Sequence, residues 1–189
     1  GLPKTIDNDI PYVRRTFGFD SAVAVATHSI HAAHVEATGV PFGVGLVKLM
    51  GRHAGYIAAN ACLATGHANV CLIPEVPFGL DGPSGLLAMI AKRVATRQHA
   101  VIVVAEGAGQ YFFDKEPKAR DASGNIKLGD IGLLLKDRLN RQFAAHGMDV
   151  SLKYIDPSYL IRSSPPNSTD QLHCLRLAQN AVHAAMAGK

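Results

Sequence analysis

The chain has 189 residues, 48% of them hydrophobic and 18% charged, which is the composition of a globular protein with a packed core. Its 19 basic and 15 acidic residues are interspersed, so we expect no nucleic-acid-binding surface. No apolar run is long enough to span a membrane, and Cys62, Cys71 and Cys174 form no CxxC pair. We therefore expect a cytoplasmic protein with no membrane anchor, zinc site or disulfide framework.

An amphipathic helix is predicted near the start of the chain. Apolar residues recur at spacings of three and four between Asp20 and Ala37. Asp20 or Ser21 is the expected N-cap, and Gly39 is the expected end.

Three histidines on this helix, at positions 28, 31 and 34, raise the alternative of a metal site. At about 100° per residue, His28 and His34 project roughly 120° apart and do not converge on one ion. We favour a solvated helix face.

The rest of the chain alternates short aliphatic runs with helical patterns, which predicts an α/β fold with a parallel sheet flanked by helices. The run at 100–105 is apolar on both faces, as expected of a central strand. Residues 110–129 lack periodicity and predict a surface insertion, and 156–167, with three prolines, predict a loop. Ser168 and Gln171 have the spacing of a capping box. Strands are expected at 43–49, 69–73, 100–105 and 150–155, and helices at 53–65, 84–97, 130–146 and 168–187.

The first nine residues, GLPKTIDND, hold the densest set of polar side chains, and Pro3 and Pro11 exclude a helix interior there. Asp7 and Asp9, with Lys4 upstream, suit phosphoryl transfer: one carboxylate accepts a proton, the other faces a metal, and the cation neutralises phosphate charge. The same residues also suit a turn whose side chains cap their own backbone.

Two further charged residues follow predicted strands, where the ligand crevice of an open parallel sheet lies. Arg52 precedes a helix and suits a phosphate ligand or a structural salt bridge. Glu106 ends a buried strand and suits ligand hydroxyls or a strand-end turn. Tyr159 and Arg162 follow the last strand, and either also suits packing of the proline-rich loop.

Five motifs in this order resemble the 6-phosphofructokinase family: PKTIDND, TFGFD at 16–20, MGR at 50–52, AEG at 105–107 and YLIR at 159–162. The resemblance covers essentially the whole chain and is strongest to the plant and protist branch that writes PKTIDND and YIDPSY. It implies a Rossmann-like phosphofructokinase fold and transfer of the γ-phosphoryl group of ATP to the C1 hydroxyl of fructose 6-phosphate in glycolysis, with Mg²⁺.

The resemblance also implies roles for individual residues. Asp7 is the expected general base, Lys4 and Thr5 the other catalytic residues, and Asp9 lies near the metal. The expected sugar-phosphate pocket consists of Thr5, Ile6, Asp7, Met50, Gly51, Arg52, Glu106, Tyr159, Leu160, Ile161 and Arg162.

The family's Gly-Gly-Asp donor loop precedes PKTIDND and is not in this sequence, so we expect a piece of a longer protein without its N-terminal donor-binding part. The expected division is 1–18 for the end of the donor domain, 19–160 for the sugar-phosphate domain and 161–189 for a segment returning towards the donor domain. We expect a homo-oligomer, either a dimer or a tetramer.

Three alternatives remain. Pyrophosphate can replace ATP as the donor, since Lys4 occurs with both donors in the family. A non-catalytic sugar-phosphate sensor can share the fold, although the presence of Asp7 argues against it. An NAD-dependent oxidoreductase is disfavoured because the chain has no GxGxxG motif.

Overall fold

The computed structural model describes residues 1–113, 120, 124 and 126–189. Its centre is a four-stranded parallel sheet in the order β2-β3-β1-β4. The strands are β1 (Gly43–Leu49), β2 (Val70–Leu72), β3 (His99–Ala105) and β4 (Ser151–Ile155). The α/β class and the parallel sheet predicted from the sequence are confirmed, and the predicted strand bounds differ from these by at most one residue.

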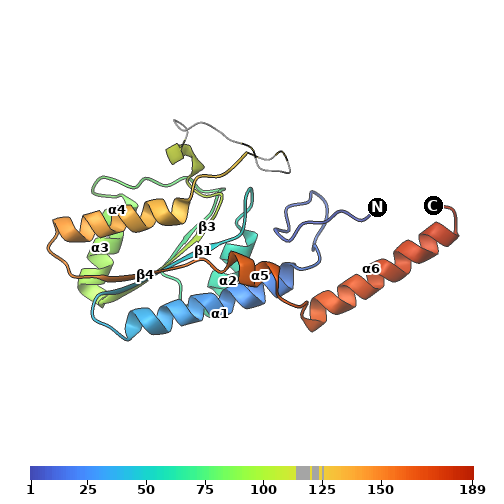
Figure 1. Ribbon diagram of the computed structural model, residues 1–189, viewed down its shortest axis with the longest axis horizontal. Helices are drawn as coiled ribbons and strands as arrows, with labels where there is room; N and C mark the ends of the chain where they lie inside the picture. The colour runs from blue at the N-terminus through green and yellow to red at the C-terminus, as the bar shows by residue number, and fades with distance from the viewer. Residues whose placement is uncertain (114–119, 121–123, 125) are drawn as a thin grey trace.

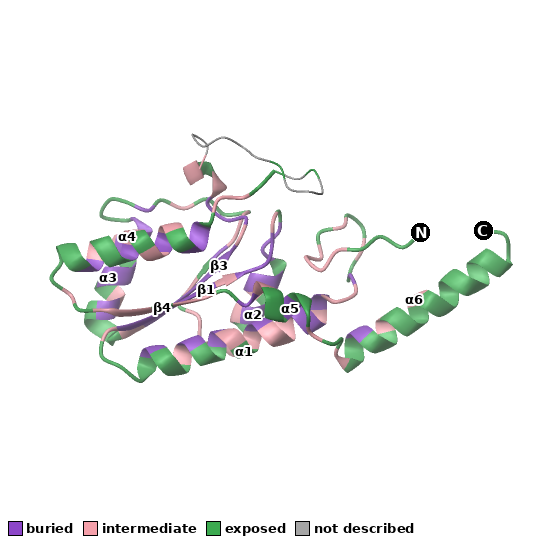
Figure 2. Ribbon diagram, in the orientation of Figure 1, coloured by how far each residue is buried: buried purple, intermediate pink, exposed green. Residues whose placement is uncertain are grey.

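Helices cover both faces of this sheet (Figure 1). One face packs on α1 (Phe19–Thr38) and α2 (Tyr56–Thr65), and the other packs on α3 (Leu86–Arg97) and α4 (Ile131–Ala145). The two apolar clusters are separated by the sheet, so β1 and β3 are buried on both sides, as Figure 2 shows in purple. This explains why the run at 100–105 carries no polar alternation.

The loop between β3 and α4 begins with a short 3₁₀ helix, Gln110–Phe113. Part of the predicted surface insertion at 110–129 lies outside the described residues. The Asp130 side chain accepts a hydrogen bond from Leu133 N (3.1 Å) and caps α4 as the sequence predicts.

Two predictions around the prolines were wrong. The segment 156–167 is not wholly a loop, because it contains a short helix, α5 (Ser158–Arg162). Its first turn forms because the Asp156 carboxylate accepts hydrogen bonds from the backbone N–H and the hydroxyl of Ser158. The final helix, α6 (Ser168–Met186), is capped by Asn167 and not by Ser168, since Asn167 Oδ1 accepts from Asp170 N at 2.9 Å.

The N-terminus of α1 is capped from a distant part of the chain. Neither Asp20 nor Ser21 caps it, because the helix starts at Phe19 after a left-handed Gly18. Instead, the buried Asp170 of α6 accepts hydrogen bonds from Gly18 N, Ser21 N and Ser21 Oγ at 2.9, 2.8 and 2.6 Å. The capping partner lies about 150 positions away, so helical periodicity near α1 could not reveal it.

The first turns of α6, which include Asp170, lie against α1. The rest of α6 projects away from the sheet, towards the side where both chain ends lie (Figure 1).

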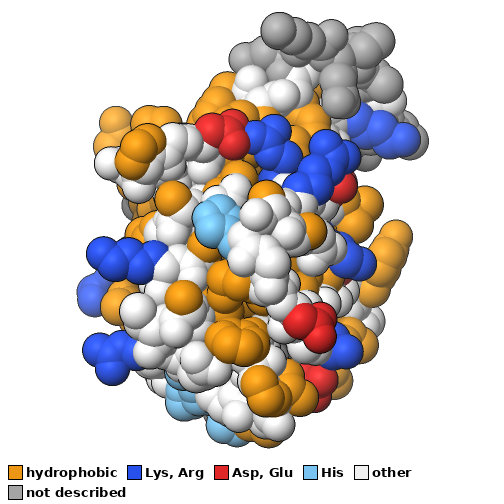
Figure 3. Space-filling view, turned by 90° about the vertical axis from the view of Figure 1, so that its left-hand side faces the viewer, with side chains coloured by type: hydrophobic (Ala, Val, Ile, Leu, Met, Phe, Trp, Pro, Cys, Tyr) orange, Lys and Arg blue, Asp and Glu red, His pale blue; other side chains and the backbone are white. Residues whose placement is uncertain are grey.

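Among the described residues, none of the helices has the length and apolar character of a membrane span. The opposite end of the molecule shows separate groups of Lys and Arg side chains rather than one continuous basic patch (Figure 3).

The histidines of α1 behave differently from one another. His28 and His31 are exposed as predicted, but His34 is half-buried and its ring stacks on His67 at 4.2 Å between centroids. Burial and the neighbouring His67, His99 and His31 lower the pKa of His34. Across the residues that the structure describes, no group of three His, Cys, Asp or Glu side chains is arranged to hold a metal ion.

Candidate active site at the carboxyl edge of the sheet

The loops that follow β1 and β3 meet at the carboxyl edge of the sheet. The backbone N–H of Glu106 donates to Leu49 O, and that of Gly107 donates to Gly51 O, both at 2.9 Å. Gly51 has φ +130°, and a Cβ on Gly107 would lie 1.8 Å from Arg52 O, so the two glycines are needed for this close approach. The approach places Arg52 and Glu106 on neighbouring loops.

Asp7 joins these loops from the start of the chain. Its Oδ2 accepts a long hydrogen bond from the backbone N–H of Arg52 (3.4 Å), and its Oδ1 is buried with no hydrogen-bond partner among the described residues. Burial raises the pKa of Asp7, and the negative charge of Asp9 adds to the rise, while the Arg52 N–H and the positive charge of Arg162 oppose it. The net result is a half-buried carboxylate of raised pKa, with one oxygen that has no hydrogen-bond partner among the described residues.

The two hypotheses for the GLPKTIDND segment, a phosphoryl-transfer site and a self-capping turn, apply to different side chains. Thr5 Oγ1 donates to Asp9 Oδ1 (2.8 Å) and accepts from Asp7 N (3.1 Å). Asn8 has φ +60° and accepts from Thr16 N at 2.8 Å. Thr5, Asn8 and Asp9 therefore hold the turn together, as a self-capping turn predicts, while the Asp7 carboxylate is left to face Arg52.

Glu106 is the second carboxylate at this edge. Burial raises its pKa, the charge of Asp7 raises it further, and Arg52 and Arg162 lower it. Arg52 also donates from Nη1 to Ile126 O at 2.7 Å. Two carboxylates and two guanidinium groups thus act on one another here, although Asp7 and Arg162 are far apart in the sequence.

Predicted site residues from the first loop and from α5 line one small cavity of about 210 Å³. Thr5 and Ile6 come from the first loop, and Ile161 and Arg162 come from α5. Lys4 lies at the same cavity, which brings a third cationic group to this edge. The fold therefore brings Thr5, Ile6, Ile161 and Arg162 to one cavity, although they lie about 155 positions apart in the sequence.

Four of the expected residues differ from one another in how far they are buried. Met50 and Ile161 are buried, with exposed fractions of 4% and 3%, and pack in the apolar cluster beneath α1 and α2. The side chains of Tyr159 and Leu160 are exposed by 86% and 66%.

An ion-pair group near the end of β1 was not predicted from the sequence. Lys48, the one polar side chain in β1, forms ion pairs with Asp130 at 3.1 Å and Asp156 at 2.9 Å. Burial alone would lower the pKa of Lys48, but these two carboxylates outweigh it and raise the pKa. A lysine inside an otherwise aliphatic strand was the signal that could have revealed this group.

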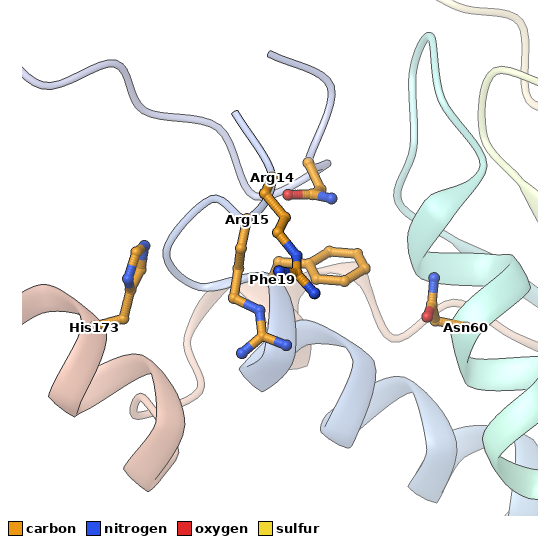
Figure 4. A pocket seen from close by; sticks show the side chains of 6 residues that line it. Arg14, Arg15, Phe19, Asn60 and His173 are labelled. Carbon is orange, nitrogen blue, oxygen red and sulfur yellow. The ribbon is translucent and has the colours of Figure 1, made fainter. Parts of the chain in front are cut away.

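A larger cavity of about 650 Å³ lies on the other side of the first loop, between α2 and α6. Arg14 and Arg15 extend from the loop into it, with Phe19 beside them and Asn60 and His173 on opposite sides (Figure 4). Arg15 is paired with Asp20 at 3.0 Å. Phe19 belongs to the TFGFD motif, but no residue of this cavity was among the predicted site residues.

Comparison with known proteins shows the family of the chain. Residues 1–185 match the family described as phosphofructokinase. The chain belongs to the phosphofructokinase family. Curated relatives named ATP-dependent 6-phosphofructokinase are 55% identical in Amycolatopsis methanolica, 53% in Arabidopsis thaliana (number 1) and 50% in Borreliella burgdorferi, each over 100% of this chain.

The phosphofructokinase fold is also seen in solved structures. A pyrophosphate-dependent phosphofructokinase from Marinobacter aquaeolei has a TM-score of 0.72 and 26% identity over 99% of this chain and 44% of its own. Pichia pastoris phosphofructokinase has a TM-score of 0.65 at 21% identity, over 96% of this chain and 18% of its own, and shows the shared fold. The chain spans 40 to 44% of the length of the three curated relatives.

Proposed function

We propose that the protein is an ATP-dependent 6-phosphofructokinase, which transfers the γ-phosphoryl group of ATP to the C1 hydroxyl of fructose 6-phosphate and forms fructose 1,6-bisphosphate in glycolysis. The observation that carries this proposal is the buried Asp7 Oδ1, which has no hydrogen-bond partner within the described structure. The names of relatives at 50 to 55% identity support the same reaction.

Asp7 is the proposed general base. A base works best when its pKa approaches the working pH, and burial raises the pKa of Asp7 in that direction. The Arg52 N–H fixes Oδ2, so Oδ1 is the atom that accepts the hydroxyl proton. As the proton leaves, the C1 oxygen becomes a better nucleophile for the phosphoryl group.

The remaining predicted residues have roles in binding. Arg52 and Arg162 offer charge-assisted hydrogen bonds to the 6-phosphate, and Glu106 accepts from sugar hydroxyls. Lys4, at the same small cavity as Thr5, neutralises charge on the phosphoryl group in transfer. Ile6, Met50, Gly51 and Ile161 shape the pocket. Tyr159 and Leu160, on α5, complete the proposed pocket.

Mg²⁺ is the cofactor proposed with ATP, and Asp9 is its proposed protein ligand. Mg²⁺ prefers carboxylate oxygens and takes most of its other ligands from water and phosphate, so one exposed carboxylate beside Asp7 fits it. When bound, the ion supplies neutralisation of phosphate charge. The contribution of this chain is to hold Asp9 through Thr5 Oγ1 at 2.8 Å.

Pyrophosphate is the second candidate donor, and one observation favours it: the Marinobacter structure is named pyrophosphate-dependent. The curated relatives named ATP-dependent are about twice as similar in sequence, which is why ATP is proposed. The proposal also includes a division of the chain into domain segments 1–18, 19–160 and 161–189. It further includes assembly as a homo-oligomer and a cytoplasmic location.

Replacing Asp7 with Asn tests the assignment. In the full-length protein with Mg²⁺ and ATP, D7N should lower kcat by about 10² to 10⁴ and leave KM for fructose 6-phosphate nearly unchanged. Pyrophosphate in place of ATP in the wild-type assay distinguishes the two donors. Wild-type turnover by D7N would exclude Asp7 as the base. If the wild-type protein bound fructose 6-phosphate but turned over neither donor, the alternative of a non-catalytic sugar-phosphate sensor would be favoured.

A further inference from the structure

Two cysteines, Cys62 on α2 and Cys71 on the edge strand β2, lie on the same side of the sheet. Along β2, Val70 and Leu72 pack in the cluster beneath α3 and α4, so the intervening Cys71 points to the opposite face. Cys71 is also in register with Val103, whose side chain belongs to the cluster beneath α1 and α2. The Cys71 thiol therefore faces α2.

Cys62 comes to the same place from the helix. It follows the buried Ala61 on α2 and packs, partly buried, against the same apolar cluster. The elements that carry the two cysteines, α2 and β2, are in direct contact. We propose that Cys62 and Cys71 form a reversible disulfide that links α2 to the edge of the sheet.

The two thiols differ in a way that sets the order of the reaction. The interaction between the two thiols lowers the pKa of Cys71 and raises that of Cys62. Cys71 is exposed and Cys62 is half-buried, so Cys71 is both the more accessible thiol and the one whose thiolate is stabilised. Cys71 is the attacking thiol, and Cys62 is the resolving thiol.

The proposed oxidant is a low-molecular-weight disulfide. The Cys71 thiolate attacks one of its sulfurs, which forms a mixed disulfide and releases one thiolate. Deprotonated Cys62 then attacks the sulfur of Cys71, which releases the second thiolate. The two protein protons end on the two released thiols, so two cysteines are oxidised and one small disulfide is reduced.

This reaction is distinct from phosphoryl transfer and from the structural disulfides of secreted proteins. The two cysteines are separated by only eight residues, and Glu75 already joins the loop after β2 to the start of α2, accepting from Gly55 N at 2.8 and 3.1 Å. This contact holds the two elements together in the reduced protein. The third cysteine, Cys174, lies on the projecting α6 and serves as an internal control.

The test treats the reduced 189-residue chain with oxidised glutathione, blocks the remaining thiols and measures mass. Trypsin leaves both cysteines on one peptide, residues 53–92. That peptide should lose two hydrogen atoms and carry no glutathione, while Cys174 should carry glutathione. The variant C174S should give the same result for 53–92. Separate glutathione adducts on Cys62 and Cys71, or two unreacted thiols, would overturn the proposal.

Single substitutions test the order of attack. C62S should stop at a stable mixed disulfide between Cys71 and glutathione, because the resolving thiol is absent. C71S should react more slowly at Cys62 than C62S reacts at Cys71. Equal or reversed rates would overturn the assigned roles, and a cross-link from either cysteine to Cys174 would overturn the pairing.

Discussion

Two carboxylates, Asp7 and Asp170, are placed very differently by the same fold. Asp170 is fully buried, and its two oxygens accept three hydrogen bonds of 2.6 to 2.9 Å at the start of α1. Asp7 is only partly buried, yet it has one long hydrogen bond and one oxygen without a partner. A carboxylate whose hydrogen bonds are all made within the chain serves the fold, whereas one left incomplete at a loop edge is available for chemistry.

The largest effect on stability should come from removing the hydrogen bonds that Asp170 accepts at the start of α1. In D170N, an NH₂ group replaces one acceptor oxygen and faces the N–H of Gly18 or Ser21, which leaves buried donors without partners. We expect the free energy of unfolding to fall by about 2 to 4 kcal/mol. Urea unfolding of the 189-residue chain measures this.

The matched control is D137N, on the surface of α4, where the ion pair with Arg141 spans one helical turn. That pair contributes only about 0.3 to 0.5 kcal/mol. If D170N and D137N cost the same, the capping role of Asp170 is wrong.

The next effect should fall on ligand binding. Arg162 acts on both Asp7 and Glu106, so R162A should remove a charge-assisted bond worth about 1.5 to 3 kcal/mol to the sugar phosphate. The dissociation constant for fructose 6-phosphate should rise about 10- to 100-fold, measured by calorimetry, with little change in unfolding.

Arg97 provides the control, because it ends α3 just before β3 begins, at the opposite edge of the sheet. R97A should bind as the wild type does. Equal losses in R162A and R97A would point to a general loss of positive charge and not to a local phosphate contact.

The smallest effect concerns His34, whose Nδ1 is also buried without a partner among the described residues but lies beside other histidines. Its pKa is lowered in the folded chain, so the unfolded chain binds more protons below about pH 6.5. Stability should therefore be complete above that pH and fall as the pH drops through the folded pKa.

Substitution of His34 by Gln should reduce this loss, by about 1 to 3 °C in the pH 5.5 against pH 7.5 difference of Tm. The exposed His28, substituted in the same way, is the control. An unchanged pH dependence in H34Q would show that protonation of His34 does not destabilise the folded chain. If the expected change is seen, the buried Nδ1 of His34 affects stability, unlike the Oδ1 of Asp7, which we propose meets a ligand.

The sequence predicted the sheet well because β1 and β3 are buried on both faces and their aliphatic runs are continuous. It also placed Arg52 and Glu106 at one edge, since parallel strands end on the same side. It failed where partners are distant in sequence: Asp170 with α1, Lys48 with Asp130, and His34 with His67. Local periodicity contains no information about such pairs.

The position of α5 was missed for a different reason. Three prolines in twelve residues indicate a loop, but Pro157 sits at the N-cap, where its missing N–H costs nothing. The expected pocket residues Tyr159 and Leu160 consequently project outward from a helix.

We propose that the carboxylate of Asp7, and not that of Asp170, contacts the substrate. The direct measurement is the ¹³C NMR resonance of the aspartate carboxyl groups of the 189-residue chain during titration with fructose 6-phosphate. We predict that the Asp7 carboxyl resonance shifts with saturation and that the Asp170 resonance stays in place. An Asp7 resonance that does not move while the sugar phosphate binds would contradict the account.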